Sequence, residues 1–164
     1  MDYLNGGSMA DKIKQSENGM PLEQVRKLFR QLVSALYYCH EVSGIIHRDV
    51  KPENIMLNKA NEIVLCDFGV SNLFKSENDL IKGSTGTMKF FAPEIVSPEK
   101  TKIMRGKKVD IWAAGITLYN MMTKQFPFEA KTIPQMQHIL LHEPPKLELV
   151  NEHPDLKNLL ERIF

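Results

Sequence analysis

The sequence has little of what marks secreted, membrane-spanning or polyanion-binding proteins. Its 164 residues include two cysteines, Cys39 and Cys66, which fit small core side chains in a reducing compartment better than a disulfide framework, with a redox role for Cys66 left open. No apolar run approaches the ~18 residues of a membrane helix, and residues 1–20 lack the apolar core of a signal peptide. The 21 basic residues are balanced by 20 acidic ones, which argues against a nucleic-acid partner.

The chain does have enough apolar content, 43% of its residues, to build one compact core. Apolar side chains at helical spacing predict helices over Pro21–Val42 and Pro154–Phe164. The segment Lys108–Lys124 is apolar almost all round, which predicts a helix at the centre of the core, and Thr132–Leu141 is expected to be a further helix that ends before Pro144. Short extended pieces are expected at 45–49, 55–57 and 62–66, with a hairpin turn between the last two. The predicted fold class is α+β and mainly α-helical, with a small β element.

Three short motifs follow one another in the middle of the chain. Residues 47–54 spell H-R-D-V-K-P-E-N, residues 67–69 spell D-F-G, and residues 92–94 spell A-P-E. A catalytic loop of the form H-R-D-x-x-x-x-N followed by D-F-G and A-P-E is the known signature of protein kinases. On these residues the chain resembles a eukaryotic protein kinase over nearly its whole length, and the small β element then falls at the active site.

The resemblance implies a role for each polar residue of the catalytic loop. Asp49 matches the residue that accepts and orients the proton of the substrate hydroxyl, and Lys51 matches the lysine that neutralises the transferring γ-phosphate. Asn54 and Asp67 match the pair that holds two Mg²⁺ ions. Each residue alone would more often be a turn former or a cap, so the expectation rests on their order.

The implied cofactors are ATP and Mg²⁺. Backbone groups of Asp2 and Leu4 are expected to bond the adenine edge, and Met56 to form the apolar floor beneath it. Ser8 stands where many relatives carry an acidic residue near the ribose. Its alternative role is the N-cap of a helix over Met9–Lys14.

Other residues match structural positions of the family. His47 is expected to be a packed core residue that stacks with Phe68, and Gly69 completes the D-F-G motif. Asp110 belongs to a D-x-W-x-x-G pattern that includes Trp112, and its carboxylate is expected to accept hydrogen bonds from the catalytic-loop backbone. The other histidines have no recognised ligand spacing and are expected at the surface or in an interface: His40, His138, His142 and His153.

The residues around the catalytic loop also bear on substrate class and on activation. Ser/Thr kinases place a lysine two residues after the catalytic aspartate, as Lys51 is placed, and a threonine such as Thr87 contacts both. Arg48 precedes the catalytic aspartate, and kinases with arginine there usually need a phosphate on the activation segment. Ser84 is the favoured phosphosite and Thr85 its neighbour. Activation without phosphate is the open alternative.

Several parts of a kinase are missing from the sequence. It contains no G-x-G-x-x-G loop and no V-A-I-K-like strand, and residues 1–8 resemble the hinge between the two lobes. Residues 1–164 are therefore expected to be a partial kinase domain, a C-lobe running from the hinge to the H helix, with the N-lobe and the final helices absent. Glu94 of A-P-E is expected to lack its usual arginine partner, because Arg162 lies inside the last predicted helix.

The expected function is that of a Ser/Thr protein kinase which transfers the ATP γ-phosphate to protein hydroxyls, as a fragment inactive on its own. The alternative is a non-catalytic scaffold or regulatory binding module. Expected partners are a protein substrate and an upstream kinase or regulatory subunit, in the cytoplasm and also the nucleus. Residues 67–72, 86–87 and 107–128 look most like the calcium/calmodulin-dependent protein kinase kinases, and next like AMP-activated/Snf1-like kinases.

Overall fold

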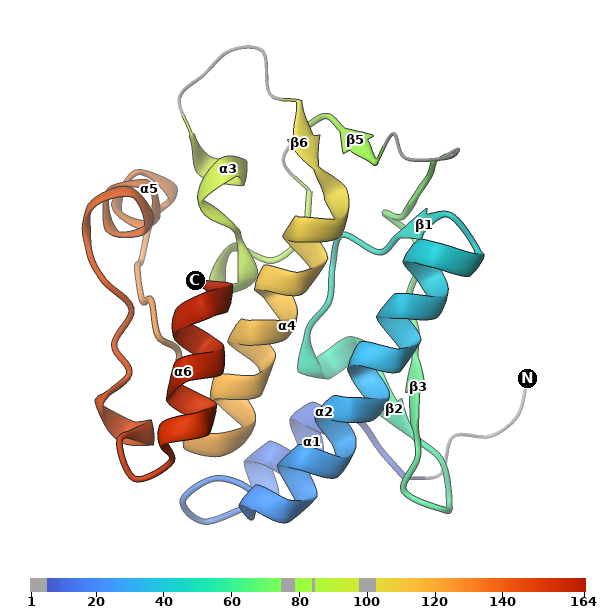
Figure 1. Ribbon diagram of the computed structural model, residues 1–164, viewed down its shortest axis with the longest axis vertical. Coiled ribbons are helices and arrows are strands. Elements are labelled where there is room, and N and C mark those ends of the chain that lie inside the picture. The colour runs from blue at the N-terminus through green and yellow to red at the C-terminus, as the bar shows by residue number, and fades with distance from the viewer. Residues whose placement is uncertain (1–5, 75–78, 84, 98–102) are drawn as a thin grey trace.

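The computed structural model describes residues 6–74, 79–83, 85–97 and 103–164, which form a helix-rich fold with short pairs of strands (Figure 1). The helices are α1 (Met9–Gln15), α2 (Leu22–Tyr37), α3 (Pro93–Val96), α4 (Gly106–Thr123), α5 (Ile133–His142) and α6 (Pro154–Ile163). The strands are β1 (Ile45–Ile46), β2 (Ile55–Leu57), β3 (Ile63–Leu65), β4 (Asn72–Leu73), β5 (Leu80–Ile81) and β6 (Met104–Arg105). Single helical turns of other types lie at Tyr38–Val42 (π) and at Pro52–Asn54, Met88–Phe90 and Glu148–Val150 (3-10).

Helix α4 lies at the centre of the core because it is apolar on nearly all sides. It runs between α2 and α6 in Figure 1, and both helices contact it. Four large side chains within two turns of this helix are each at most 2% exposed: Ile116, Leu118, Tyr119 and Met121. The helix begins two residues before the predicted start, and it ends at Thr123 because Lys124 adopts a left-handed conformation with φ of 59°. Within the described residues no helix is both long and apolar enough to cross a membrane.

Helix α2 is amphipathic and turns one apolar face toward α4. Val25, Leu28, Leu32 and Leu36 are three or four residues apart, and all are buried. The regular helix ends at Tyr37, and the continuation predicted to Val42 is a π-helical turn instead. Gly44 ends the segment with φ of 63°, and a Cβ there would lie 2.6 Å from the carbonyl oxygen of Phe74.

The six strands form three separate antiparallel pairs. The predicted hairpin is present as β2 and β3, with Ile55 opposite Leu65 and Leu57 opposite Ile63. β1 lies within the extended piece predicted at 45–49, although the strand ends at Ile46. Its partner β4 and the pair β5–β6 were not predicted, because strands of two residues leave no periodic pattern. Together these strand pairs attach the chain that follows Asp67 to the catalytic loop and to the start of α4.

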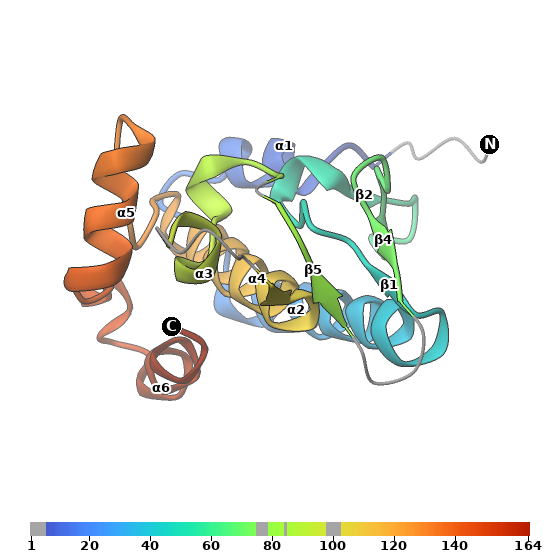
Figure 2. The same cartoon turned by 90° about the horizontal axis from the view of Figure 1, so that it is seen from above.

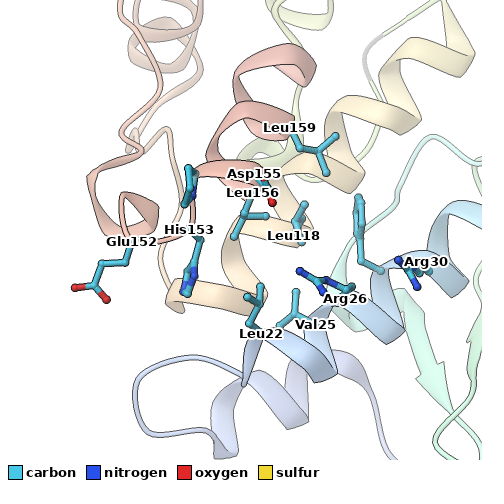
Figure 3. A pocket seen from close by; sticks show the side chains of 12 residues that line it. Leu22, Val25, Arg26, Arg30, Leu118, Glu152, His153, Asp155, Leu156 and Leu159 are labelled. Atoms are coloured by element: carbon cyan, nitrogen blue, oxygen red, sulfur yellow. The ribbon is translucent and has the colours of Figure 1, made fainter.

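Helix α6 packs Leu156 and Leu160 inward and borders a groove on the surface of the molecule. The groove has a volume of about 350 Å³ and lies between α2, α4 and α6 (Figure 3). Its lining is mostly apolar, with the charged side chains of Arg26 and Arg30 on α2 (Figure 3). None of the predicted site residues lines this groove.

Candidate active site

The carboxylate of Asp49 is the centre of a compact polar network. Thr87 donates to Asp49 Oδ1 from its backbone nitrogen at 3.1 Å and from Oγ1 at 3.0 Å. Lys51 Nζ lies 2.6 Å from Asp49 Oδ2 and donates to Thr87 Oγ1 at 2.8 Å. Asn54 Nδ2 donates to the Asp49 backbone oxygen at 2.8 Å and to Oδ2 at 3.1 Å. The fold thus brings together four predicted site residues from two segments of the chain.

This network keeps the Asp49 carboxylate ionised at neutral pH. Burial alone would raise the pKa of Asp49, but hydrogen bonds from Lys51, Thr87 and Asn54, together with the Lys51 charge, outweigh it and hold the pKa below its usual value. An ionised carboxylate at this place can accept a hydrogen bond from a hydroxyl group and orient it.

Asn54 and Asp67 supply oxygen atoms of the kind that Mg²⁺ prefers. The amide nitrogen of Asn54 is committed to Asp49, which leaves its Oδ1 as an acceptor. A backbone hydrogen bond of 2.8 Å from Cys66 N to the Asn54 oxygen links the two segments one residue before Asp67. Asp67 is exposed and has φ of 60°, and its Oδ1 accepts a bond from Gly69 N at 3.2 Å. This donor set fits a hard divalent cation.

The catalytic loop rests on the carboxylate of Asp110, which comes from the first turns of α4. His47 N donates to Asp110 Oδ2 at 2.8 Å and Arg48 N donates to Oδ1 at 2.8 Å, as predicted. The prediction that His40 lies at the surface is wrong: His40 is buried, and its Nε2 lies 2.7 Å from Asp110 Oδ2. The π-helical turn at the end of α2 carries His40 inward, where it completes the support of the loop.

His47 is fully buried, and both of its ring nitrogens are engaged. Nε2 donates to the Cys66 carbonyl oxygen at 2.9 Å, and Nδ1 accepts a bond from Asp49 N at 3.3 Å. The centroid of the His47 ring lies 4.8 Å from the ring centroid of Phe68, the predicted stacking partner. His47 is therefore a packed core residue and has no free nitrogen with which to act as a general base.

Arg48 contacts the segment that follows Asp67 through neutral oxygen atoms. With φ of 70°, it donates to Asn72 Oδ1 at 2.8 Å and to the carbonyl oxygens of Lys82 at 3.2 Å and Gly83 at 3.4 Å. Of the predicted regulatory hydroxyls, Ser84 lies outside the described residues, Thr85 is exposed and Thr87 is engaged with Asp49. Sequence reasoning missed Asn72 as a partner of Arg48.

Sequence reasoning also missed Asp79, a buried carboxylate that links the start of β5 to the start of α4. Asp79 Oδ1 accepts a bond from Arg105 Nη1 at 3.0 Å, and Oδ2 accepts one from Lys107 N at 3.2 Å. The backbone oxygen of Asp79 accepts a further bond from Gly106 N at 2.8 Å. Asp79 and β5–β6 together fix one end of the segment that carries Thr87.

The remaining predicted site residues lie as follows. Asp2 and Leu4 are outside the described residues, and Met56 is half-buried in β2. Ser8 caps α1: Asp11 N donates to Ser8 Oγ at 3.1 Å, and Ser8 N donates back to Asp11 Oδ2 at 2.9 Å. The N-cap role left open for Ser8 is therefore present.

Two structural residues predicted from the motifs also have defined surroundings. Trp112 is buried, and its ring stacks on Phe128 at 5.6 Å and contacts Phe164 at 5.0 Å. Glu94 lies in α3 and forms no ion pair within the part of the chain that the structure describes.

Both cysteines are free thiols. Burial raises the pKa of Cys66, and the negative charge of Asp67 raises it further. Burial likewise raises the pKa of Cys39, with an added contribution from Asp110. A raised pKa lowers the thiolate fraction at neutral pH, so neither environment favours a reactive thiol.

Comparison with known proteins places this fold and site in a family. The family model of the protein kinase domain matches residues 1–162, and the chain therefore belongs to the protein kinase domain family. Proteins of this family use ATP and Mg²⁺.

Proteins similar in sequence to this chain include several protein kinases. The chain is 39% identical over 163 residues to serine/threonine-protein kinase ppk34 of Schizosaccharomyces pombe, covering 99% of this chain and 45% of the relative. It is 38% identical over 168 residues to a probable serine/threonine-protein kinase of Dictyostelium discoideum, covering 99% of this chain and 23% of the relative. It is 36% identical over 129 residues to the carbon catabolite-derepressing protein kinase of Saccharomyces cerevisiae, covering 79% and 19% respectively. The chain spans less than half the length of each of these relatives.

Proposed function

We propose that this chain forms the C-lobe of a Ser/Thr protein kinase that transfers the γ-phosphate of ATP to protein hydroxyls. The observation that carries the proposal is the network in which Lys51, Asn54 and Thr87 all contact the Asp49 carboxylate. Relatives named as serine/threonine-protein kinases support the same reaction.

In this proposal Asp49 orients the hydroxyl group of the substrate, and Lys51 contacts the phosphate that is transferred. Asp49 accepts the hydrogen bond of the attacking hydroxyl and takes its proton as the bond to phosphorus forms. Its lowered pKa makes it a weak base, so its main contribution is orientation of the nucleophile. The Lys51 ammonium group, held 2.6 Å from Asp49 Oδ2, lies where it can also neutralise charge on the transferring group.

Mg²⁺ and ATP would bind next to this network. When bound, Mg²⁺ would supply the positive charge that offsets the phosphate charge. Asn54, through its uncommitted Oδ1, and the exposed carboxylate of Asp67 would hold the metal ions. Met56 would contact the adenine ring from below, and the backbone of Asp2 and Leu4 would bond its edge.

Specificity for Ser and Thr follows from the contacts of Thr87. Its hydroxyl donates to Asp49 and accepts from Lys51, so it ties the segment after the D-F-G motif to the catalytic loop. This arrangement matches the Ser/Thr class of kinases, to which Lys51 two residues after Asp49 also points.

Residues 1–164 would represent the domain from the hinge to the H helix. The sequence contains no Gly-rich loop and no strand lysine to cover ATP, so the N-lobe would come from other polypeptide sequence. The partners would be a protein substrate and an activating kinase or regulatory subunit. Two free thiols suit the reducing conditions of the cytoplasm and nucleus.

Activation by phosphate would act through Arg48. Its guanidinium group is held by Asn72 and by two carbonyl oxygens, which are neutral acceptors. A phosphate on Ser84 or Thr85 would offer a charge-assisted partner close to Gly83 and would strengthen this attachment.

The test is a Mg-ATP phosphotransfer assay on the natural polypeptide that contains this chain and an N-lobe, with matched Ser, Thr and Tyr peptides. We expect transfer to Ser and Thr peptides and loss of about 100-fold or more in kcat on Asp49→Asn. Transfer to Tyr peptides alone would overturn the Ser/Thr assignment.

Residues 1–164 alone are the second arm of this test. We expect no transfer, because half of the nucleotide cleft is absent. Transfer by 1–164 that disappears on Asp49→Asn would overturn the need for an N-lobe. If the natural polypeptide transferred no phosphate yet bound stable protein partners, the scaffold function would replace the catalytic one.

A further inference from the structure

Two histidines stand side by side near the C-terminal end of α5. His138 and His142 are four residues apart on this helix, both are exposed, and their ring centroids are 5.0 Å apart with an angle of 49° between the planes. Helix α5 lies at the edge of the molecule in both Figure 1 and Figure 2. The pair has no part in the function proposed above. Sequence reasoning found no ligand spacing among these histidines, but α5 places His138 and His142 one turn apart on the same helix.

The separation of the rings fits two ligands of one metal ion. Zn²⁺ binds imidazole nitrogen at about 2.0–2.1 Å, so two rings on one ion have centroids about 4.6 Å apart at a right angle and about 5.3 Å apart at the tetrahedral angle. The observed 5.0 Å falls between these values. Histidines at i and i+4 lie on one helix face, and exposed side chains are free to turn one nitrogen each toward a common ion.

The end of α5 also has a favourable charge for a cation. His142 is the last residue of the helix, where unpaired carbonyl groups carry the negative end of the helix dipole. Glu143 follows directly, and with Glu129 and His138 it lines a shallow hollow beside the helix. Lys131 lines the same hollow and opposes the two carboxylates, so the imidazoles must supply most of the binding.

We propose that His138 and His142 form a surface binding site for a transition-metal ion of the Zn²⁺, Cu²⁺ or Ni²⁺ type. Imidazole nitrogen suits these ions, whereas the carboxylate and amide oxygens of Asp67 and Asn54 suit Mg²⁺. Among the described residues no cluster of three or more metal-ligating side chains exists. The ion therefore keeps open positions, which water or a donor group from another molecule fills.

The experiment is a Zn²⁺ titration of the 164-residue chain, followed by NMR of the histidine ring signals in the presence of excess Mg²⁺. Mg²⁺ occupies the oxygen site, and the ring signals separate histidine binding from binding to the two free thiols. We expect the signals of His138 and His142 to shift together with a one-to-one stoichiometry. His138→Ala and His142→Ala should each weaken binding by about tenfold or more, because each removes one of two metal bonds.

A matched control keeps two histidines but moves one off the shared face. His142→Ala combined with Gln137→His places the second ring within α5 but about 100° around the helix from His138, and we expect this variant to bind as weakly as His142→Ala alone. His153→Ala, a change outside α5, should leave the titration unchanged. His138 and His142 are exposed and Gln137 is half-buried, so the fold should be retained, and circular dichroism checks this. Absence of coupled shifts in the natural chain, or full affinity in the relocated control, would overturn the proposal.

Discussion

Two aspartates differ in how they serve the catalytic loop: Asp110 supports the loop from α4, and Asp49 belongs to the loop itself. Asp110 is fully buried and accepts bonds from the backbone of His47 and Arg48 and from the ring of His40. The side chain of Asp49 keeps 12% of its surface exposed, and its partners are the side chains of Lys51, Asn54 and Thr87.

This difference in surroundings predicts that Asp110 mainly contributes to the stability of the fold and that Asp49 mainly contributes to catalysis. The partners of Asp110 are backbone donors and a buried ring, which are lost only when the loop unfolds. Two partners of Asp49 are themselves expected to contact reaction components, Lys51 the phosphate and Asn54 the metal, so they serve the reaction first. A change at Asp110 should therefore alter folding, and a change at Asp49 should alter turnover.

The largest effect on stability is expected from Asp110→Ala. It leaves two backbone N–H groups and the His40 ring without their buried acceptor, which costs about 3–5 kcal/mol of unfolding free energy. Urea denaturation of the 164-residue chain measures this as a lower midpoint. Asp110→Asn keeps the shape but offers one acceptor oxygen in place of two, and it should also destabilise strongly. A midpoint unchanged in both variants would remove the structural role of Asp110.

The reverse result is expected for Asp49→Asn. The amide keeps an acceptor for Thr87 but loses the charge that pairs with Lys51, so kcat should fall about 100-fold or more while the unfolding midpoint moves much less than in Asp110→Ala. Kinetics on the natural polypeptide and denaturation of the same variant test both halves. If Asp49→Asn unfolded at as low a urea concentration as Asp110→Ala, Asp49 would contribute to stability as much as Asp110 does, and the proposed separation of roles would be wrong.

Residues that share one continuous motif could be predicted from the sequence. Asp49, Lys51 and Asn54 lie within six consecutive positions, and a match to that spacing indicates them together. Thr87 and Asp110 lie far along the chain, and only the family resemblance connected them to the loop. The two long helices could be predicted for different reasons: α2 buries apolar side chains at helical spacing, whereas α4 is apolar on nearly all sides, as expected of a central core helix.

Residues whose partners are remote and outside any motif were missed. His40 bonds a residue 70 positions away, although it continues the buried series 28, 32 and 36 by one more step of four, a signal that could have placed it inside. Asp79 pairs with Arg105 across 26 positions. Neither the acidic side chain of Asp79 nor the two-residue strand that follows it gives a local sign of burial, because the contact exists only once β5 and β6 meet.

Asp79 is a third aspartate, and we expect its loss to lower the stability of the chain less than the loss of Asp110 does. Asp79→Ala removes the acceptor of Lys107 N at the start of α4 and of Arg105, which should cost about 1–2 kcal/mol. Most of this comes from the backbone donor, since the Arg105 side chain is 60% exposed and its ion pair is screened by water. Arg105→Ala, the matched partner change, should therefore destabilise the chain less than Asp79→Ala in urea denaturation.

The contribution of Asp79 should also depend on pH. Burial alone would raise the pKa of Asp79, but bonds from Arg105 and Lys107 lower it below 3.8, the value for the free side chain. The folded state thus favours the ionised form, so the stabilisation is complete above about pH 4 and is lost as pH falls through the folded-state pKa. The difference in urea midpoint between the unsubstituted 164-residue chain and its Asp79→Ala variant should become smaller at acidic pH. A difference that grew below pH 4 would contradict this.

The smallest effect is expected at Asp11, an exposed aspartate with the same kind of lowered pKa. Side-chain and backbone bonds from Ser8 lower the pKa of Asp11, but the group is fully open to water. Asp11→Asn keeps an acceptor for the Ser8 backbone, so the urea midpoint should move less than in Asp79→Ala. The same variant tests the open alternative for Ser8: if its hydroxyl also binds the ribose, freeing it from Asp11 should change the KM for ATP of the natural polypeptide. If Ser8 acts only as the cap of α1, the KM should stay constant, and hydrogen exchange in the first turn of α1 should rise instead.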